Sequence, residues 1–174
     1  MRLYNMDAIS QMRDSNKNAA LKKRLMQLLI MTDSASISDM AKELDVSIPT
    51  VTKFVYELLD KQFLVDLGKQ STSGGRKPSI YGLNPDSGYF VGVDVQRKKI
   101  LFATIDFRGK LVSEPMEVPY NLEDTPEALN VLSRAIKEYI ACLGVPRQKI
   151  LQIGVNIASR VNSEKGYSYS FFYF

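Results

Sequence analysis

Two groups of side chains in the first half of the chain have the chemistry needed to bind a polyanion. The first group lies at the start of an expected helix and is short or basic: Ser47, Pro49, Thr50, Thr52 and Lys53. The second group is the basic side chains of residues 68–79, a glycine-containing segment without an acid: Lys69, Arg76 and Lys77. Hydroxyl and cationic groups bind the phosphates and base edges of duplex nucleic acid, and a threonine methyl can contact a thymine methyl.

The residues around the first group predict two short amphipathic helices joined by a tight turn at Asp45-Val46. The segment 36–39, Ser-Ile-Ser-Asp, resembles a capping box, and Ser47 is expected to cap the second helix. The apolar stripes are Ile37, Met40, Ala41 and Leu44 for the first helix, and Val51, Phe54, Val55, Leu58 and Leu59 for the second. An ordinary helix with a polar face is the alternative, since serine and threonine also start helices for capping alone.

The flanking segments complete the pattern. Residues 18–31 predict a helix with one stripe, formed by Leu21, Leu25, Leu28 and Leu29; Lys22, Lys23 and Arg24 lie largely off it, as a solvated surface or as phosphate contacts. Residues 63–67 and 80–83 predict strands that bracket the basic segment, which a flexible linker would not show. We therefore predict a winged helix-turn-helix over residues 18–84, after an N-terminal extension at 1–17.

Composition bounds the other functions that the sequence could have. The formal net charge is +4 and the pI is about 9.1, but this excess is small enough to be an ordinary solvated surface. The sequence has no histidine and one cysteine, Cys142, which excludes an internal disulfide, histidine-based triads and His–Cys zinc sites. Cys142 lies on the apolar side of an expected helix, where we expect a buried thiol. The N-terminus lacks the apolar run of a signal peptide and no stretch approaches a membrane span, so we expect a cytoplasmic protein.

The second half of the chain, residues 85–174, predicts an α/β domain. Strands are expected over residues 89–95, 99–107, 110–118 and 150–158. A helix is expected to start at Thr125 and to stop at Gly144, with a stripe of Leu129, Leu132, Ile136, Ile140 and Leu143. This order of three strands, a helix and a strand is an α/β pattern.

From about residue 20 onward the chain resembles the ROK family, which groups repressors with sugar kinases. The resemblance rests on VSIPTVTKFVYELLDKQFL, GGRKPSIYGLNP, GYFVGVDVQRKKI and IGVNIASRVNSEKGYSYS. The first two stretches are similar to the winged helix-turn-helix of the repressor branch, and the last two to the first lobe of its sugar-kinase fold. The resemblance implies an α+β chain: a winged helix-turn-helix followed by part of an α/β actin-like ATPase lobe, which is ribonuclease H-like.

The chain departs from the kinases of this family in its ligand loops. Those kinases have glycines after the aspartate that corresponds to Asp94, whereas Gln96 and Arg97 stand among the residues that follow here. A second family loop usually carries Pro-Gly, and the corresponding residues here are Ala158 and Ser159, followed by Arg160. The family's Asn-Asp motif, zinc-binding cluster and second lobe do not occur. We therefore expect a vestigial cleft without catalytic residues, cofactor or metal, and a truncation or disrupted reading frame near residue 174.

The hypothesis that follows is a sugar-responsive transcription repressor with double-stranded DNA as its partner. A dimer would match a two-fold operator, and the apolar segment 167–174 is expected to favour self-association. A sugar or sugar phosphate is expected as effector only in a complete protein. One alternative is a sugar kinase, which an ATPase assay would detect. The other is a ligand-independent DNA-binding or dimerisation fragment, which a sugar titration during DNA binding would distinguish.

Overall fold

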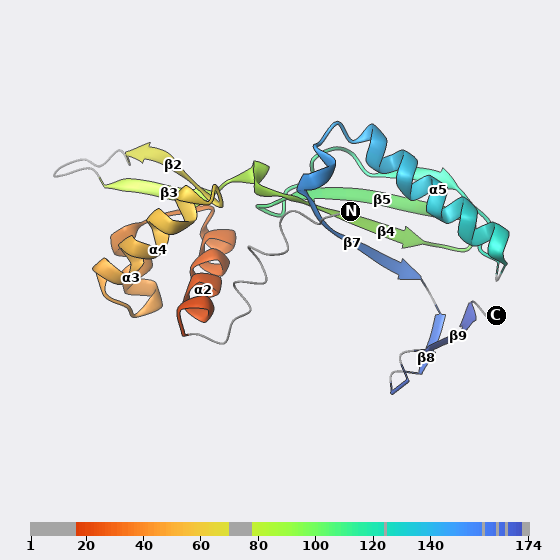
Figure 1. The fold of residues 1–174 in the computed structure, drawn as a ribbon, viewed down its shortest axis with the longest axis horizontal. Helices are drawn as coiled ribbons and strands as arrows, with labels where there is room; N and C mark the ends of the chain where they lie inside the picture. The colour runs from red at the N-terminus through yellow and green to blue at the C-terminus, as the bar shows by residue number, and fades with distance from the viewer. Residues whose placement is uncertain are drawn as a thin grey trace. The chain divides into compact units, whose positions relative to one another are not determined.

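The computed structural model describes residues 17–69, 78–123, 125–157, 159–162, 164–165 and 167–171. The chain divides into two compact units. The first runs to Ser87 and also includes the turn Phe107–Gly109, and the second holds Gly88–Asp106 and the chain from Lys110 onward. Figure 1 shows the helices and strands of each unit.

The first unit consists of helices packed beside a small antiparallel sheet. Its elements are α2 (Lys17–Thr32), β1 (Ser34–Ser36), α3 (Ile37–Leu44), α4 (Ile48–Asp60), β2 (Leu64–Lys69), β3 (Ser79–Leu83) and the short 3-10 helix η1 (Pro85–Ser87). The sheet has the order β1-β3-β2, so β3 lies between two antiparallel neighbours. The sequence did not predict β1, which pairs Ser34 with Gly82 and Ser36 with Ile80.

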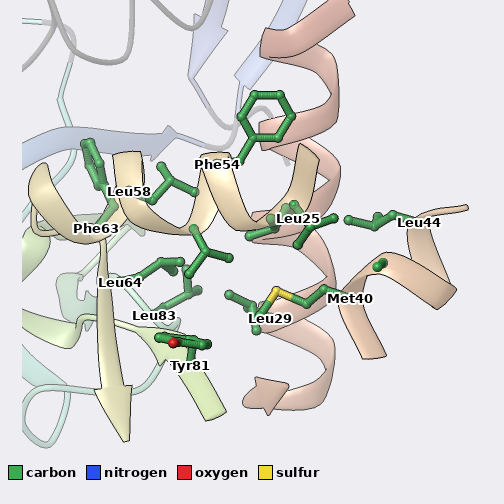
Figure 2. Packing of buried hydrophobic residues seen from close by; sticks show 13 residues of the cluster. Leu25, Leu29, Met40, Leu44, Phe54, Leu58, Phe63, Leu64, Tyr81 and Leu83 are labelled. Carbon is green, nitrogen blue, oxygen red and sulfur yellow. The ribbon is translucent and has the colours of Figure 1, made fainter. Parts of the chain in front are cut away.

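The core of this unit joins the three helices to the sheet, as Figure 2 shows. The predicted stripes are confirmed: Leu25 and Leu29 of α2 and Val51 and Leu58 of α4 are at most 1% exposed. Burying a side chain of this size stabilises a fold by about 1.5–3 kcal/mol relative to leaving it in water. Because the stripe fixes the rotation of each helix, it also determines which face of α4 stays exposed.

Capping residues set the tight turn between α3 and α4. Ser36 occupies the N-cap of α3, where its Oγ accepts the backbone N–H of Asp39 at 3.2 Å and donates to the Asp39 carboxylate at 2.6 Å. At the other end Asp45 adopts a left-handed conformation with φ of 54°, and the N–H of Val46 donates to the carbonyl of Ala41. The chain therefore reverses within Asp45–Ser47 and starts α4 at a fixed angle.

The second unit is a mixed sheet with one helix packed against it. Its elements are β4 (Tyr89–Val95), β5 (Lys99–Asp106), β6 (Met116–Pro119), α5 (Pro126–Cys142), the 3-10 helix η2 (Arg147–Lys149), β7 (Ile150–Ile157), β8 (Ser159–Asn162) and β9 (Tyr167–Phe171). The four-stranded sheet has the order β6-β5-β4-β7, in which only β4 and β7 are parallel. Tyr139 of α5 stacks on Phe102 of β5 and shares a hydrogen bond with the buried Thr104.

Three sequence-based expectations for this unit are wrong. The third strand covers only Met116–Pro119 instead of residues 110–118, because Pro115 has no N–H to donate and only Leu111 bridges back to Ile105. Leu129 is 64% exposed, and Ala128 beside it is buried in its place, whereas Leu132, Ile136 and Leu143 of the predicted stripe do pack against the core of this unit. Cys142, in the last turn of α5, is exposed instead of buried.

The C-terminal segment pairs within its own chain. Strand β9 lies antiparallel to β8, with Ser159 opposite Phe171 and Asn162 opposite Tyr167. One edge of the segment that is expected to favour self-association is therefore paired within the chain. Within the part of the chain that the structure describes, no helix has the length and apolar character needed to cross a membrane.

Candidate nucleic-acid interface

The start of α4 presents an exposed polar surface. Ser47 is the N-cap, with extended backbone angles, and its carbonyl accepts the N–H of Val51 at 3.2 Å. Pro49 lies in the first turn, where a helix needs no N–H donor. Ser47, Pro49 and Lys53 are exposed, whereas Thr50 and Thr52 are half-buried. The predicted side chains therefore lie together on the first two turns of one helix, opposite its packed face.

The hydroxyl groups of this surface are ordered by short local hydrogen bonds. The Ser47 and Thr50 hydroxyls lie 2.8 Å apart, and Thr52 donates to the Ile48 carbonyl at 2.8 Å. Ser47 is the N-cap residue of α4, as predicted, but its side chain makes no capping bond to the backbone and pairs with the Thr50 hydroxyl instead. Because one hydroxyl of the pair donates to the other, the second keeps its proton for an external acceptor.

Glu57, an acid in the middle of α4, is paired with a lysine of α2. Lys22 forms an ion pair and hydrogen bond with Glu57, and its ammonium also lies 5.1 Å from the centre of the Phe54 ring. The hydrogen bond from Lys22 lowers the pKa of the Glu57 carboxyl, so it stays ionised and paired at neutral pH. Lys22 is thus neither a freely solvated cation nor an available phosphate ligand, the two alternatives that the sequence left open. Lys23 and Arg24 are exposed on the same helix.

The hairpin of β2 and β3 carries a bulge close to its basic segment. The register shifts between Asp66 and Lys69, Gly68 has φ of 89°, and its N–H donates to the Asp66 carboxylate at 2.8 Å. Lys69, the last residue of β2, is exposed. Arg76 and Lys77, the other predicted cations, lie outside the described residues. The bulge therefore sets the direction in which the chain leaves β2.

Sequence reasoning missed two large side chains exposed on α4. Ile48, the first residue of the helix, is 55% exposed, and Tyr56, two turns further, is 59% exposed. Tyr56 contacts Tyr81 of β3, whose pKa is raised chiefly by burial and further by Asp66 and Tyr56. The signal that could have found Ile48 was present, since it is an apolar residue that falls outside the buried stripe of its own helix.

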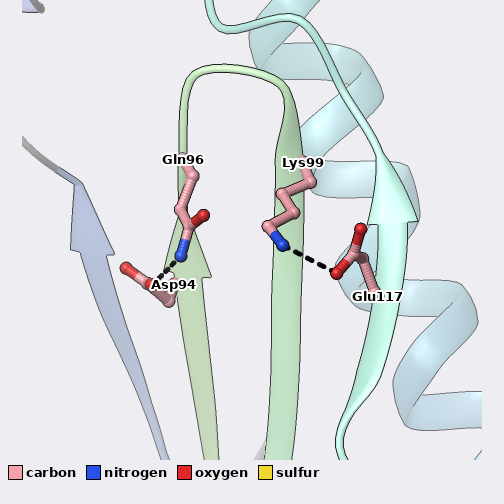
Figure 3. Close-up of polar contacts among 4 residues, drawn as sticks. All are labelled: Asp94, Gln96, Lys99 and Glu117. Carbon is pink, nitrogen blue, oxygen red and sulfur yellow. Dashed lines mark hydrogen bonds and ion pairs between the residues drawn. The ribbon is translucent and has the colours of Figure 1, made fainter.

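A second candidate site lies where the parallel strands β4 and β7 end. Asp94 is opposite Asn156 in the register, and its Oδ1 accepts the Asn156 side-chain amide at 2.6 Å. Its Oδ2 accepts the Gln96 amide at 2.7 Å, as Figure 3 shows. The N–H of Gln96 donates to the Lys99 carbonyl at 2.9 Å, closing the turn that exposes Arg97. The structure thus brings Asp94 and Gln96 together and adds Asn156, which the sequence analysis did not single out.

The remaining predicted cleft residues are only partly described. Ala158 lies outside the described residues, and Ser159 and Arg160 are described as backbone only, in β8. Beside the Asp94 cluster, Lys99 of β5 and Glu117 of β6 form an ion pair at 2.8 Å (Figure 3). Among the described residues no cluster of three or more carboxylates, cysteines or histidines is placed to hold a metal ion.

These features define the class of fold: a winged helix-turn-helix followed by part of an actin-like lobe. The fold of the chain is similar to that of a solved structure, a ROK family transcriptional regulator described as a homologue of the E. coli MLC protein. The TM-score is 0.59 at 19% identity, over 84% of this chain and 37% of that one. The predicted α+β architecture is therefore confirmed.

Curated relatives carry the same resemblance at the level of sequence. The xylose repressor of Caldicellulosiruptor bescii is 26% identical over 154 residues, and that of Bacillus subtilis is 23% identical over 146. These alignments cover 86% and 83% of this chain but only 39% and 37% of the relatives, so the chain spans well under half of their length. No family model matches the chain. The resemblance to ROK-family regulators that the sequence predicted is confirmed by these comparisons.

Proposed function

We propose that the chain carries the DNA-binding part of a sugar-responsive transcription repressor of carbohydrate-metabolism genes. The observation that carries the proposal is the exposed start of α4, where Ser47, Pro49 and Lys53 face solvent while the opposite face of the helix is packed. A helix held in this way can enter the major groove with its N-terminal residues toward the base edges. This function also agrees with the expected cytoplasmic location.

The charge distribution supports the same proposal. Lys22 neutralises Glu57, so the exposed first half of α4 presents Lys53 without a competing free carboxylate from that acid. In the proposed complex, Lys53 contacts phosphates, together with Lys69, Arg76 and Lys77 of the basic segment 68–79. Contacts of this kind supply affinity for any sequence, whereas the short side chains at the helix start supply preference among sequences.

The effector and the oligomeric state belong to the same proposal. Because the relatives are named xylose repressors, xylose is the first sugar to test, followed by other sugars and sugar phosphates. In a complete protein, effector binding should weaken operator binding, and such coupling is reciprocal and typically about 1–3 kcal/mol. We further propose a homodimer on a two-fold operator, since two recognition helices one helical turn apart match that symmetry.

A sugar kinase is the weaker alternative. Both carboxylate oxygens of Asp94 accept amide hydrogen bonds, and the side chains of Gln96 and Arg97 occupy the turn where a phosphate-binding loop needs bare backbone. ADP production that depends on a sugar and is lost in Asp94→Ala would favour the kinase over the repressor.

The function can be tested by selecting duplexes from a random pool with the protein. Selection of a preferred sequence supports the repressor, and fluorescence anisotropy of the selected duplex then gives its affinity. Titrating xylose into the complete protein with its duplex separates a sugar-responsive repressor, which releases DNA, from a ligand-independent DNA-binding protein, which does not. Absence of any duplex binding would contradict both.

A further inference from the structure

Ile48 is exposed although nothing in its own fold requires an isoleucine there. It is the first residue of α4 and 55% of its surface is exposed, whereas Val51, Phe54, Val55 and Leu58 are at most 2% exposed. Single exposed apolar side chains are common on protein surfaces, so exposure alone does not make a site. Its position beside the proposed base-contacting hydroxyls is what distinguishes Ile48.

The entry of the chain into α4 is stabilised by a different residue. Val46, which precedes the N-cap Ser47, packs against the same core cluster as Val51, in the positions that form a hydrophobic staple. Ile48 is not part of this cluster. Truncating its side chain should therefore leave the fold and the direction of α4 unchanged.

Thr52 extends the apolar surface of Ile48 by one helical turn. Residues four apart are neighbours on a helix, and the Thr52 hydroxyl donates to the Ile48 carbonyl at 2.8 Å. The hydroxyl proton is therefore engaged within the helix, and Thr52 offers a partner its methyl group and an acceptor lone pair. Ile48 and Thr52 together present methyl groups at the end of the helix that the proposed function directs toward base edges.

We propose that Ile48 is a specificity-determining residue that contacts the C5-methyl group of a thymine in the major groove. Among the four bases of DNA, only thymine presents an apolar group there. The inference rests on the proposed function and deepens it, because it assigns a base preference to one side chain. The protein should then prefer a thymine at one position of each half-site and discriminate against deoxyuridine, which differs only by that methyl.

The test combines a base change with a side-chain change. Each thymine of the selected duplex is replaced in turn by deoxyuridine, and binding is measured for the protein, Ile48→Ala and Ile48→Val. Removing one buried methyl should weaken binding by the protein about fourfold at the contacted position. Ile48→Ala should bind the thymine duplex more weakly and bind the thymine and deoxyuridine duplexes equally well at that position. Ile48→Val should give an intermediate ratio.

Ile30→Ala is the matched control, because Ile30 is an isoleucine of similar exposure, 53%, on α2. It should keep the discrimination of the unchanged protein. The inference is overturned if Ile48→Ala keeps the same thymine-to-deoxyuridine ratio at every position, or if the protein selects no preferred sequence. In either case salt-dependent duplex binding would leave the DNA-binding proposal standing, whereas loss of all duplex binding would remove both.

Discussion

Lys22 of α2 and Glu57 of α4, which are 35 residues apart in sequence, form an ion pair that joins the two helices. The ammonium of Lys22 also lies 5.1 Å from the centre of the Phe54 ring, one turn before Glu57 on the same helix. The pair thus helps to fix the position of the proposed recognition helix and offsets the negative charge of an acid on that helix. Its side chains are 20% and 35% exposed, so solvent screens part of its energy.

Glu57→Gln should therefore lower the free energy of unfolding only modestly, by about 0.5 kcal/mol at pH 7. Because the folded-state pKa of Glu57 lies below its ordinary 4.5, the contribution is complete above pH 4.5 and disappears as the pH falls through the lowered value. Urea unfolding at pH 7 and pH 3 measures the effect, with Glu43→Gln, an exposed glutamate of α3, as control. A deficit of equal size at both pH values would contradict the ion-pair account.

The bulge in β2 gives a second prediction. A methyl group added to Gly68 would meet no atom within 4 Å, so Gly68→Ala costs only the strain of a left-handed backbone with φ of 89°. We expect a decrease of about 1–2 kcal/mol in unfolding free energy. Gly154→Ala is the control, because its added methyl also meets open space and its backbone is not left-handed. Equal stability of the two variants in urea unfolding would show that the bulge is not strained.

Apolar spacing was sufficient to predict the elements that build the core. The stripes of α2, α3 and α4 and the bounds of β4 follow from local patterns, because side chains at those spacings must share a face. Strand β1 was missed because three residues carry no period, and its structure comes from pairing with β3, far away in sequence. Leu129 was wrongly placed in the stripe of α5 because its neighbour Ala128 is also apolar, and spacing alone did not show which of the two is buried.

The two amide hydrogen bonds that Asp94 accepts, from Gln96 and Asn156, predict a pH-dependent effect of substitution at Asn156. Asn156→Asp would place a second carboxylate at the 2.6 Å contact with Asp94, raising the pKa of the pair by repulsion. Because the folded state then holds a proton more tightly than the unfolded state, stability should fall as the pH rises above about 4, by about 1 kcal/mol at neutral pH. Asn156→Ala, which removes only a hydrogen bond, should show no such slope. If Asn156→Asp and Asn156→Ala have the same dependence of unfolding free energy on pH, the contact between Asn156 and Asp94 is contradicted.

The hydrogen bonds of the α4 hydroxyl groups predict that substitutions at two neighbouring threonines affect DNA binding differently. Thr50 pairs with Ser47 on the exposed side, whereas Thr52 donates to the backbone of its own helix. Thr50→Val should change the relative affinity among related duplexes, because it removes a hydroxyl group from the proposed base-contacting surface. Thr52→Val keeps the methyl group, replaces a hydroxyl that is engaged within the helix, and should preserve the ranking. Competition binding with single-base variants of the selected duplex measures both, and an altered ranking for Thr52→Val alone would reverse the assignment.

The candidate site was predicted less completely than the fold. The side chains at the start of α4 could be named, since helix starts and exposed faces follow from local sequence. The Lys22–Glu57 pair and the Asn156–Asp94 contact could not, because each joins residues that only the tertiary structure brings together. Ile48 was overlooked because the candidate side chains were chosen as short or basic, and isoleucine is neither.

The most direct test of the central claim is equilibrium binding to the selected duplex over a range of salt, from about 50 to about 200 mM. The logarithm of the association constant should fall linearly with the logarithm of the salt concentration. The double variant Arg76→Ala, Lys77→Ala should bind all sequences more weakly, with a slope reduced by about 0.9 for each phosphate that the variant no longer neutralises. Binding that is absent, or that does not change with salt in either protein, would contradict the proposal that this chain is the DNA-binding part of a regulator.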